Sequence, residues 1–287
     1  MDVALRPQID TGTLLAQHRD AAAAASDGAP INYRVTSGAG TPKAVVVMVT
    51  GTHGTPETFD LMANELSRSR ITSYSVGSRT IAPNAAQHAD DLERMVQLAI
   101  AEHPRTPIAV MGTSLGAMVA LDWRARLNTG KLPVLAMNPV LMEKILPFSD
   151  RAKIAAGLFS KRFADMRVNT PMTLGVPLTT NPLSLEFAPP HPERLTVRAG
   201  LYGDVAKMLG KTALHAREAR GPLTIAIAGA DKVAVNGATS LFAHLLRGDP
   251  KTVMTIAGEA HDLSQAANNP QFVRAVRDFV LKFARVP

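Results

Sequence analysis

The chain has 287 residues, a length that one α/β domain with a sizeable core can fill. Hydrophobic residues make up 46% and charged residues 19%, which excludes a largely disordered chain. The absence of cysteine excludes disulfide scaffolds, thiolate metal sites and cysteine nucleophiles. The net charge of +7 comes from scattered Lys and Arg, with only three Tyr and one Trp, so it indicates a solvated basic surface rather than nucleic-acid binding.

No segment has the pattern of a targeting signal or a membrane span. Asp2 stands where a secretory signal carries cations, and no apolar run follows it. The longest uncharged stretches, 106–121 and 168–185, are interrupted by glycine or proline. We therefore expect a soluble cytoplasmic protein without stable membrane insertion. Non-classical export and transient contact with a membrane surface stay open.

The first 26 residues are predicted to be an N-terminal extension, in which Ala21–Ala25 favours a helix too short to persist alone. Downstream, apolar runs and alternating patterns predict strands, and apolar residues at helical spacing predict helices between them. The strands are expected at 31–35, 44–49, 71–76, 108–111, 132–137, 223–228 and 252–257. The helices are expected to carry the apolar faces 59–66 (beginning at Pro56 and capped by Thr55), 92–99, 118–125, 241–246 and 272–283.

This alternation predicts an α/β fold, in which a mostly parallel central sheet carries helices on both faces. It breaks between residues 140 and 221, where seven prolines interrupt short apolar segments and no clean strand is expected. We expect residues 140–221 to be a cap (lid) insertion. The core would then consist of residues 27–139 and 222–287.

The pentapeptide Gly112-Thr113-Ser114-Leu115-Gly116 lies between a predicted strand and a predicted helix. A nucleophile at such a strained turn needs glycine two positions to either side, because the backbones approach closely there. A serine that merely caps the helix is the alternative. The strand–turn–helix setting favours Ser114 as a nucleophile.

A serine nucleophile in this setting requires an acid and then a base later in the chain. Asp231 and His261 each follow a predicted strand, and the carboxyl ends of parallel strands meet at one edge of the sheet. We expect Asp231 to orient His261 as the general base, the alternatives being a turn aspartate and a locally bonded loop histidine. His244 lies mid-helix, where a packed or surface imidazole is expected. Asn138 follows an earlier strand but its amide cannot serve as the acid, and Asp262 is expected to point away from the base.

The oxyanion formed during acyl transfer requires two fixed N–H donors. The backbone amide of Leu115 opens the helix after the nucleophile and benefits from its positive end. The backbone amide of Thr52, in the loop 50–54 after a buried strand, is the expected second donor. His53 in the same loop is expected to order the loop or lie on the surface.

From Asp27 onward, the chain resembles α/β hydrolases of the monoacylglycerol lipase, lysophospholipase and serine-aminopeptidase type. The resemblance rests on the turn Asp27-Gly28, Gly51 with Phe59 eight residues later, Gly112–Gly116, Gly229-Ala230-Asp231 and Gly258-Glu259-Ala260-His261. It implies the α/β-hydrolase fold, a Ser-His-Asp triad and ester hydrolysis through an acyl-enzyme. Two loops depart from the family pattern, since Thr50 replaces a histidine and the loop after the fourth strand is reduced to 77–79.

The implied substrate is a small-molecule ester with an acyl chain held by apolar residues of the cap. No cofactor is expected, because the phosphate-loop and dinucleotide fingerprints are absent. No metal is expected either, because capping and solvation explain His88, Asp90 and Asp91 at a helix start. A thioesterase, peptidase or acyltransferase with the same triad stays open, as does a non-catalytic ligand-binding protein.

Overall fold

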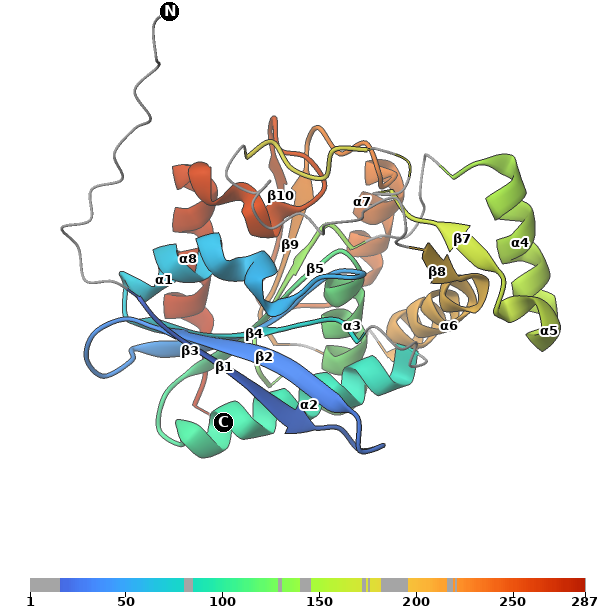
Figure 1. The fold of residues 1–287 in the computed structure, drawn as a ribbon. Coiled ribbons are helices and arrows are strands. Elements are labelled where there is room, and N and C mark those ends of the chain that lie inside the picture. The colour runs from blue at the N-terminus through green and yellow to red at the C-terminus, as the bar shows by residue number, and fades with distance from the viewer. Residues whose placement is uncertain are drawn as a thin grey trace, which may run out of the picture.

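A computed structural model of the chain describes residues 16–79, 85–128, 131–139, 146–171, 174, 176–181, 196–215, 219 and 221–286. Eight strands form one central sheet (Figure 1). In spatial order they are β1 (Gln17–Ala24), β2 (Pro30–Ser37), β4 (Ile71–Val76), β3 (Ala44–Val49), β5 (Ile108–Thr113), β6 (Val134–Met137), β9 (Leu223–Ala228) and β10 (Lys251–Ile256). β2 pairs antiparallel with β1 and β4, and all other neighbours are parallel. The predicted α/β architecture is confirmed.

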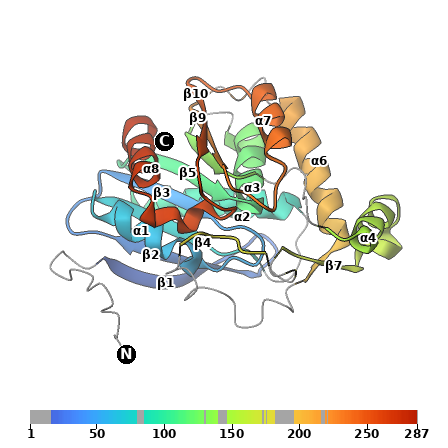
Figure 2. The ribbon, with the colours of Figure 1, turned by 90° about the horizontal axis from the view of Figure 1, so that it is seen from above.

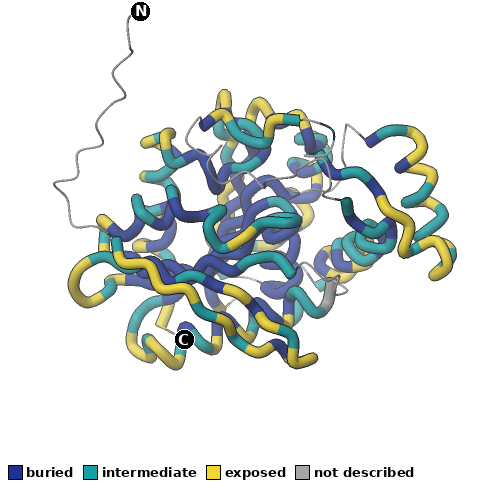
Figure 3. Tube along the Cα trace, viewed as in Figure 1, coloured by how far each residue is buried: buried dark blue, intermediate teal, exposed yellow. Residues whose placement is uncertain are grey.

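Helices cover both faces of this sheet (Figures 1 and 2). One face carries α1 (Asp60–Ser67), the 3-10 helix η5 (Leu263–Asn268) and α8 (Pro270–Phe283), and the other carries α2 (Ala85–Glu102), α3 (Leu115–Trp123), α6 (Ala199–His215) and α7 (Asn236–Leu245). Neighbouring residues of β3 contribute to opposite cores, Val45 and Val47 to one and Val46 and Met48 to the other. Because helices lie on both faces, the inner strands are buried throughout, as the dark core of Figure 3 shows.

The N-terminal boundary differs from the prediction. Gln17–Ala24, expected within an extension containing a frayed helix, is the strand β1, and all of its residues pair with β2. Its alanines favour a helix, but pairing with the edge of the sheet supplies hydrogen bonds that a short isolated helix does not retain. The predicted division at residue 26 is therefore wrong, while residues 1–15 lie outside the described residues.

Between β6 and β9 the described residues form a helical layer at one end of the sheet (Figure 1). It consists of α4 (Phe148–Phe159), α5 (Lys161–Ala164), the antiparallel pair β7 (Arg167–Asn169) and β8 (Thr196–Arg198), and α6. The β7–β8 pair was not predicted, because three-residue strands are too short to give a periodic signal. α6 joins the core, since Met208 is buried against the cluster that includes α3. A separate cap over residues 140–221 stays a prediction.

Three local expectations need correction. Thr55 precedes the 3-10 helix η1 (Pro56–Phe59), which continues into α1, but its side chain makes no capping hydrogen bond. On α7 only part of the predicted apolar face is buried, because Leu241 and Leu245 point to solvent. β10 is largely exposed rather than buried, because it is the last strand of the sheet.

Candidate active site

Ser114 lies at the sharp turn between β5 and α3. Its backbone adopts φ +54° and ψ −120°, a strained conformation that non-glycine residues rarely adopt. A Cβ on Gly112 would lie 2.3 Å from the carbonyl oxygen of Gly116, and a Cβ on Gly116 would lie 2.2 Å from that of Val49. Only glycine fits at these two positions. Ser114 precedes α3 without a side-chain capping bond, which disfavours the alternative of a capping serine.

The side chain of Ser114 faces the imidazole of His261. The distance from Ser114 Oγ to His261 Nε2 is 3.0 Å, and His261 Nδ1 lies 2.8 Å from Asp231 Oδ2. The His261 side chain is 5% exposed and that of Asp231 is fully buried. The structure thus brings the three predicted residues into one chain of hydrogen bonds. His244, by contrast, is exposed on α7 and contacts the carbonyl of Ser240 in its own helix.

The position of Asp231 follows from the sheet. β9 and β10 are parallel neighbours, so the loops after them, which carry Asp231 and His261, leave the same edge. The second carboxylate oxygen of Asp231, Oδ1, accepts the backbone N–H groups of Val233 at 2.7 Å and Ala234 at 2.9 Å. Burial raises the pKa of Asp231, but hydrogen bonds from His261 and these amides outweigh burial and hold it below its ordinary value. The carboxylate is therefore charged at neutral pH and able to stabilise an imidazolium.

Asn138 has a structural role that sequence reasoning missed. It follows β6 with φ +46° and is buried. Its Oδ1 accepts the backbone N–H of Ala228 at 2.6 Å, and its Nδ2 donates to the backbone carbonyl of His261. The side-chain amide of Asn138 thus joins the end of β9 to the loop that carries His261. A carboxylate could not make both bonds, because it has no N–H to donate.

The loop around His261 is held by two further acidic residues. As expected, Asp262 points away from the imidazole, and Oδ1 of its buried carboxyl accepts bonds from Ser264 N at 3.1 Å and Thr113 Oγ1 at 3.3 Å. Burial raises the pKa of Asp262. Glu259, which sequence reasoning did not single out, accepts a hydrogen bond from Thr180 at 2.7 Å, so residues 176–181 lie against this loop.

The loop 50–54 passes directly beside the nucleophile. A Cβ on Gly51 would lie 3.0 Å from Ser114 Cβ, so glycine allows this approach. Within the loop, Gly54 N donates to the carbonyl of Gly51 at 3.0 Å, and Thr50 Oγ1 donates to the carbonyl of Gly54 at 3.1 Å. Across the site, Leu115 is the first residue of α3, where backbone N–H groups have no acceptor within the helix. The loop expected to supply one oxyanion donor therefore passes beside Ser114, and Leu115, expected to supply the other, follows it directly.

His53 links the same loop to β8. Its backbone has φ +59°, and its ring lies close to the backbone of Thr196, which acts on its pKa. Burial lowers the pKa of His53, which favours the neutral ring. This contact agrees with the expectation of a residue that orders the loop.

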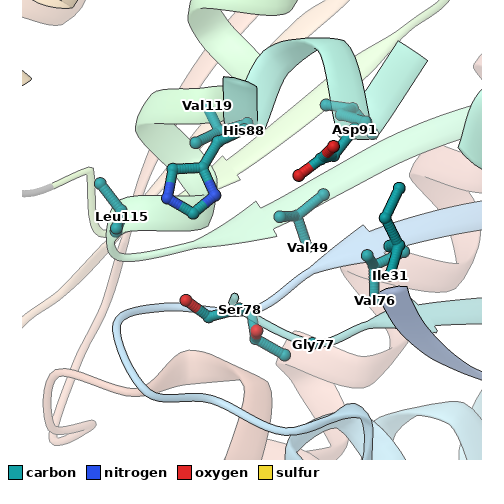
Figure 4. Close-up of a pocket in the computed structure, with 11 residues that line it drawn as sticks. Ile31, Val49, Val76, Gly77, Ser78, His88, Asp91, Leu115 and Val119 are labelled. Atoms are coloured by element: carbon teal, nitrogen blue, oxygen red, sulfur yellow. The ribbon is translucent and has the colours of Figure 1, made fainter. Parts of the chain in front are cut away.

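A small cavity lies beside the turn at Ser114, lined by Ser78, Leu115 and the α2 residues His88 and Asp91 (Figure 4). It has room for water but not for a substrate chain. Asp91 is buried and forms an ion pair with Arg79. Capping and solvation are therefore the wrong explanation for Asp91, because α2 begins at Ala85 and the carboxylate points inward. The described residues hold no group of three or more His, Asp or Glu arranged as metal ligands.

His88 is expected to make stability depend on pH. Burial, together with the charge of Arg79, lowers its pKa from 6.5 to about 4. Between these values the unfolded chain binds a proton at His88 that the folded chain does not, so stability falls as the pH falls. We expect this group to remove up to about 3 kcal/mol from the free energy of unfolding across that window.

Denaturant unfolding at about pH 7, 5.5 and 4.5 measures this effect. His88→Asn should lose less stability on acidification than the unmodified chain, and His244→Asn, which alters an exposed histidine, should behave as the unmodified chain does. Equal losses in His88→Asn and the unmodified chain would contradict the prediction.

Residues 40–266 match the sequence model of a family described as serine aminopeptidase, S33. The chain belongs to this family. Membership agrees with the resemblance inferred from the motifs and with the α/β-hydrolase arrangement of the sheet. Comparison with curated proteins found no matching sequence.

Solved structures show the same fold at low sequence identity. A soluble variant of the monoglyceride lipase from Saccharomyces cerevisiae, in complex with a substrate analogue, has a TM-score of 0.75 at 16% identity, over 98% of this chain and all of that one. The monoacylglycerol lipase of Paleococcus ferrophilus has a TM-score of 0.69 at 16% identity, over 88% of this chain and 99% of that one. A thermostable carboxyl esterase from Bacillus coagulans has a TM-score of 0.65 at 11% identity, over 93% of this chain and 97% of that one. Among the helices that the structure describes, none is both long and apolar enough to cross a membrane.

Proposed function

We propose that the protein is a serine hydrolase that cleaves carboxylic esters through an acyl-enzyme. The hydrogen-bonded series Ser114–His261–Asp231 carries this proposal, since it joins a nucleophile, a base and a buried acid in the geometry that acyl transfer requires. The lipases and esterase with the same fold support an ester as the substrate.

In the proposed reaction, His261 Nε2 accepts the proton of Ser114 Oγ as this oxygen attacks the carbonyl carbon of the ester. The tetrahedral intermediate then collapses, the bond to the alcohol breaks, and His261 returns the proton to the leaving oxygen. Water next gives a proton to His261 and attacks the acyl carbon, which releases the carboxylic acid and restores Ser114. Asp231 stays ionised and keeps the proton of the neutral imidazole on Nδ1.

The backbone amides of Leu115 and Thr52 are proposed to hold the oxyanion. Leu115 is the first residue of α3, at the positive end of the helix, and Thr52 follows Gly51, whose Cβ position would lie 3.0 Å from Ser114 Cβ; both observations support the proposal. Donors that are already in place lower the barrier, because no reorganisation is needed when charge develops.

A fluorophosphonate probe tests this proposal, because it reacts with an activated serine. We expect stoichiometric modification of the folded chain, located by peptide mass spectrometry at Ser114, and none in Ser114→Ala. A non-catalytic binding protein would stay unmodified, and modification at another serine would remove Ser114 from the proposal.

The reaction class is tested with one acyl group presented as an oxygen ester, a thioester and an anilide, and with an aminoacyl anilide. We expect the highest kcat/KM for the oxygen ester. A preference for the aminoacyl anilide would make the protein a peptidase, in line with the description of its family. Added alcohol that increases ester formation at the expense of free acid would identify an acyltransferase.

The apolar residues of the expected cap, some of which would have to face an acyl chain, have different environments. Leu158 and Phe159 are exposed, so they cannot enclose a buried chain. Leu178 lies against the loop of the base, where its carbonyl accepts the N–H of Asp262 at 2.6 Å. Leu141, Met142, Ile145 and Met172, further apolar residues of the expected cap, lie outside the described residues.

We expect acyl chains of medium length to be preferred over acetyl. Each buried methylene contributes about 0.8 kcal/mol, so four added carbons would raise kcat/KM roughly a hundredfold as long as they fit inside the pocket. Initial rates for nitrophenyl esters from acetate to octanoate measure this dependence. A flat or falling series would indicate a small acyl pocket.

A further inference from the structure

α4 turns an apolar stripe towards solvent. Phe148, Ala152, Ala155 and Phe159 recur at the spacing of one helix face, and all four are exposed. The exposed fractions of Phe148 and Phe159 are 87% and 90%. The polar Asp150 of the same helix is buried instead. α4 therefore reverses the usual pattern of a surface helix, whose apolar face meets the core.

The exposed apolar area continues into α5 and the turn after it. Leu158, Phe163 and Met166 are 50%, 41% and 39% exposed. We call the exposed apolar residues of this region, Phe148, Ala152, Ala155, Leu158, Phe159, Phe163 and Met166, the α4–α5 surface. It lies at the outer end of the molecule, away from the central sheet, and is largely exposed (Figures 1 and 3). Clusters of this kind mark interaction sites.

Positive charge surrounds this surface. Residues 148–167 contain five Lys or Arg and two Asp. The two acids are already paired, Asp150 with Lys153 at 2.7 Å and Asp165 with Arg198 at 3.1 Å. Three further exposed cations, Lys161, Arg162 and Arg167, have no acidic partner among the residues that the structure describes. They are thus available to an anionic partner.

We propose that the α4–α5 surface docks on an anionic lipid bilayer. The Phe148 and Phe159 rings would enter the interface between headgroups and acyl chains, while Lys161 and Arg162 would lie against lipid phosphates. Charge selects this partner, because a second copy of the chain would bring the same cations together. Membrane docking needs no chemistry at Ser114, so it is independent of the proposed hydrolase activity.

Docking would hold the candidate active site close to the lipid. The chain passes from α5 directly into β7, β7 pairs with β8, and Thr196 of β8 lies close to His53 in the loop beside Ser114. The membrane-facing helices are thereby connected to the loop expected to supply an oxyanion donor.

Flotation of the Ser114→Ala chain with lipid vesicles tests the proposal without hydrolysis. We expect binding to vesicles of phosphatidylcholine mixed with phosphatidylglycerol, and binding at least about tenfold weaker to phosphatidylcholine alone or in high salt. Phe148→Ser with Phe159→Ser should lower the partition coefficient about tenfold or more. Lys161→Glu with Arg162→Glu should lower it by about twentyfold or more.

Two double variants serve as matched controls. Leu241→Ser with Leu245→Ser changes residues that are 68% and 60% exposed on α7, and Lys43→Glu with Arg105→Glu makes the same charge change far from α4 in the chain. Both should bind within about twofold of the parent. Equal fluorophosphonate labelling of each variant with Ser114 restored, and an unchanged circular dichroism spectrum, would show that the fold is intact.

Three results would overturn the proposal. They are absence of binding to anionic vesicles, equal losses in the control and α4–α5 variants, and dimerisation that the α4–α5 variants abolish while vesicle binding persists. The last result would assign the surface to a second copy of the chain.

Discussion

Ser114→Ala is expected to lower kcat/KM for an activated ester such as nitrophenyl butyrate by a factor of about 10⁴ or more. The hydroxyl is the only group of this residue that reacts, and alanine leaves the turn between β5 and α3 without a nucleophile. Alanine is also smaller than serine, so the close approach of Gly51 to the Cβ of residue 114 is kept. Steady-state hydrolysis, together with the thermal unfolding midpoint of both proteins, measures the effect.

Ser78→Ala is the matched control for this measurement. Ser78 lines the small cavity near Leu115 but makes no bond to His261, so its loss should change kcat/KM by less than about threefold. Hydrolysis by Ser114→Ala near the unmodified rate, with an unchanged unfolding midpoint, would remove Ser114 from the mechanism.

Asp231→Asn is expected to lower kcat by about 10⁴-fold, the magnitude known for the corresponding change in chymotrypsin-like proteases. The amide is nearly isosteric and keeps an oxygen for the N–H groups of Val233 and Ala234. If that oxygen stays with the two amides, the NH₂ group faces His261 Nδ1. The imidazole would then carry its proton on Nε2, where it cannot accept the proton of Ser114. The imidazolium would also lose the buried charge that stabilises it.

Asp262→Asn provides the decisive comparison, because Asp262 is a second buried carboxyl group and adjoins His261 in the chain. Its hydrogen bonds to Ser264 and Thr113 support the loop without reaching the imidazole, so we expect a loss of less than about tenfold. Burial raises the pKa of this carboxyl, and an amide resembles its protonated form. The reverse order of the two losses would assign the acid to Asp262.

Much of the candidate site was predictable because its determinants are local. Ser114, Asp231 and His261 each follow a strand recognisable from a short apolar run, and parallel strands place such loops at one edge of a sheet. Gly112 and Gly116 identify the turn, since their places allow no Cβ. Neither argument depends on contacts with side chains that are far away in the sequence.

The supporting contacts depend on residues far apart in the chain, and the sequence contains no local trace of them. Asn138 joins backbone groups 90 and 123 positions away, and nothing in its own neighbourhood indicates those partners. His88 near two acids suggests a solvated helix start, whereas tertiary packing covers much of its side chain and lowers its pKa. The alanines of β1 favour a helix until the edge of β2 offers hydrogen bonds.

The outward orientation of the α4–α5 surface also depends on contacts between residues far apart in the chain. No helix was predicted here, but once residues 148–159 form one, the helical repeat by itself determines that Phe148, Ala152, Ala155 and Phe159 share a face. The sequence did not determine where that face points, since the repeat is identical whether the stripe meets a core or solvent. Only the tertiary structure decided this, because the burial of Asp150 and its bonds to Lys153 and Asn169 turn the phenylalanine rings outward.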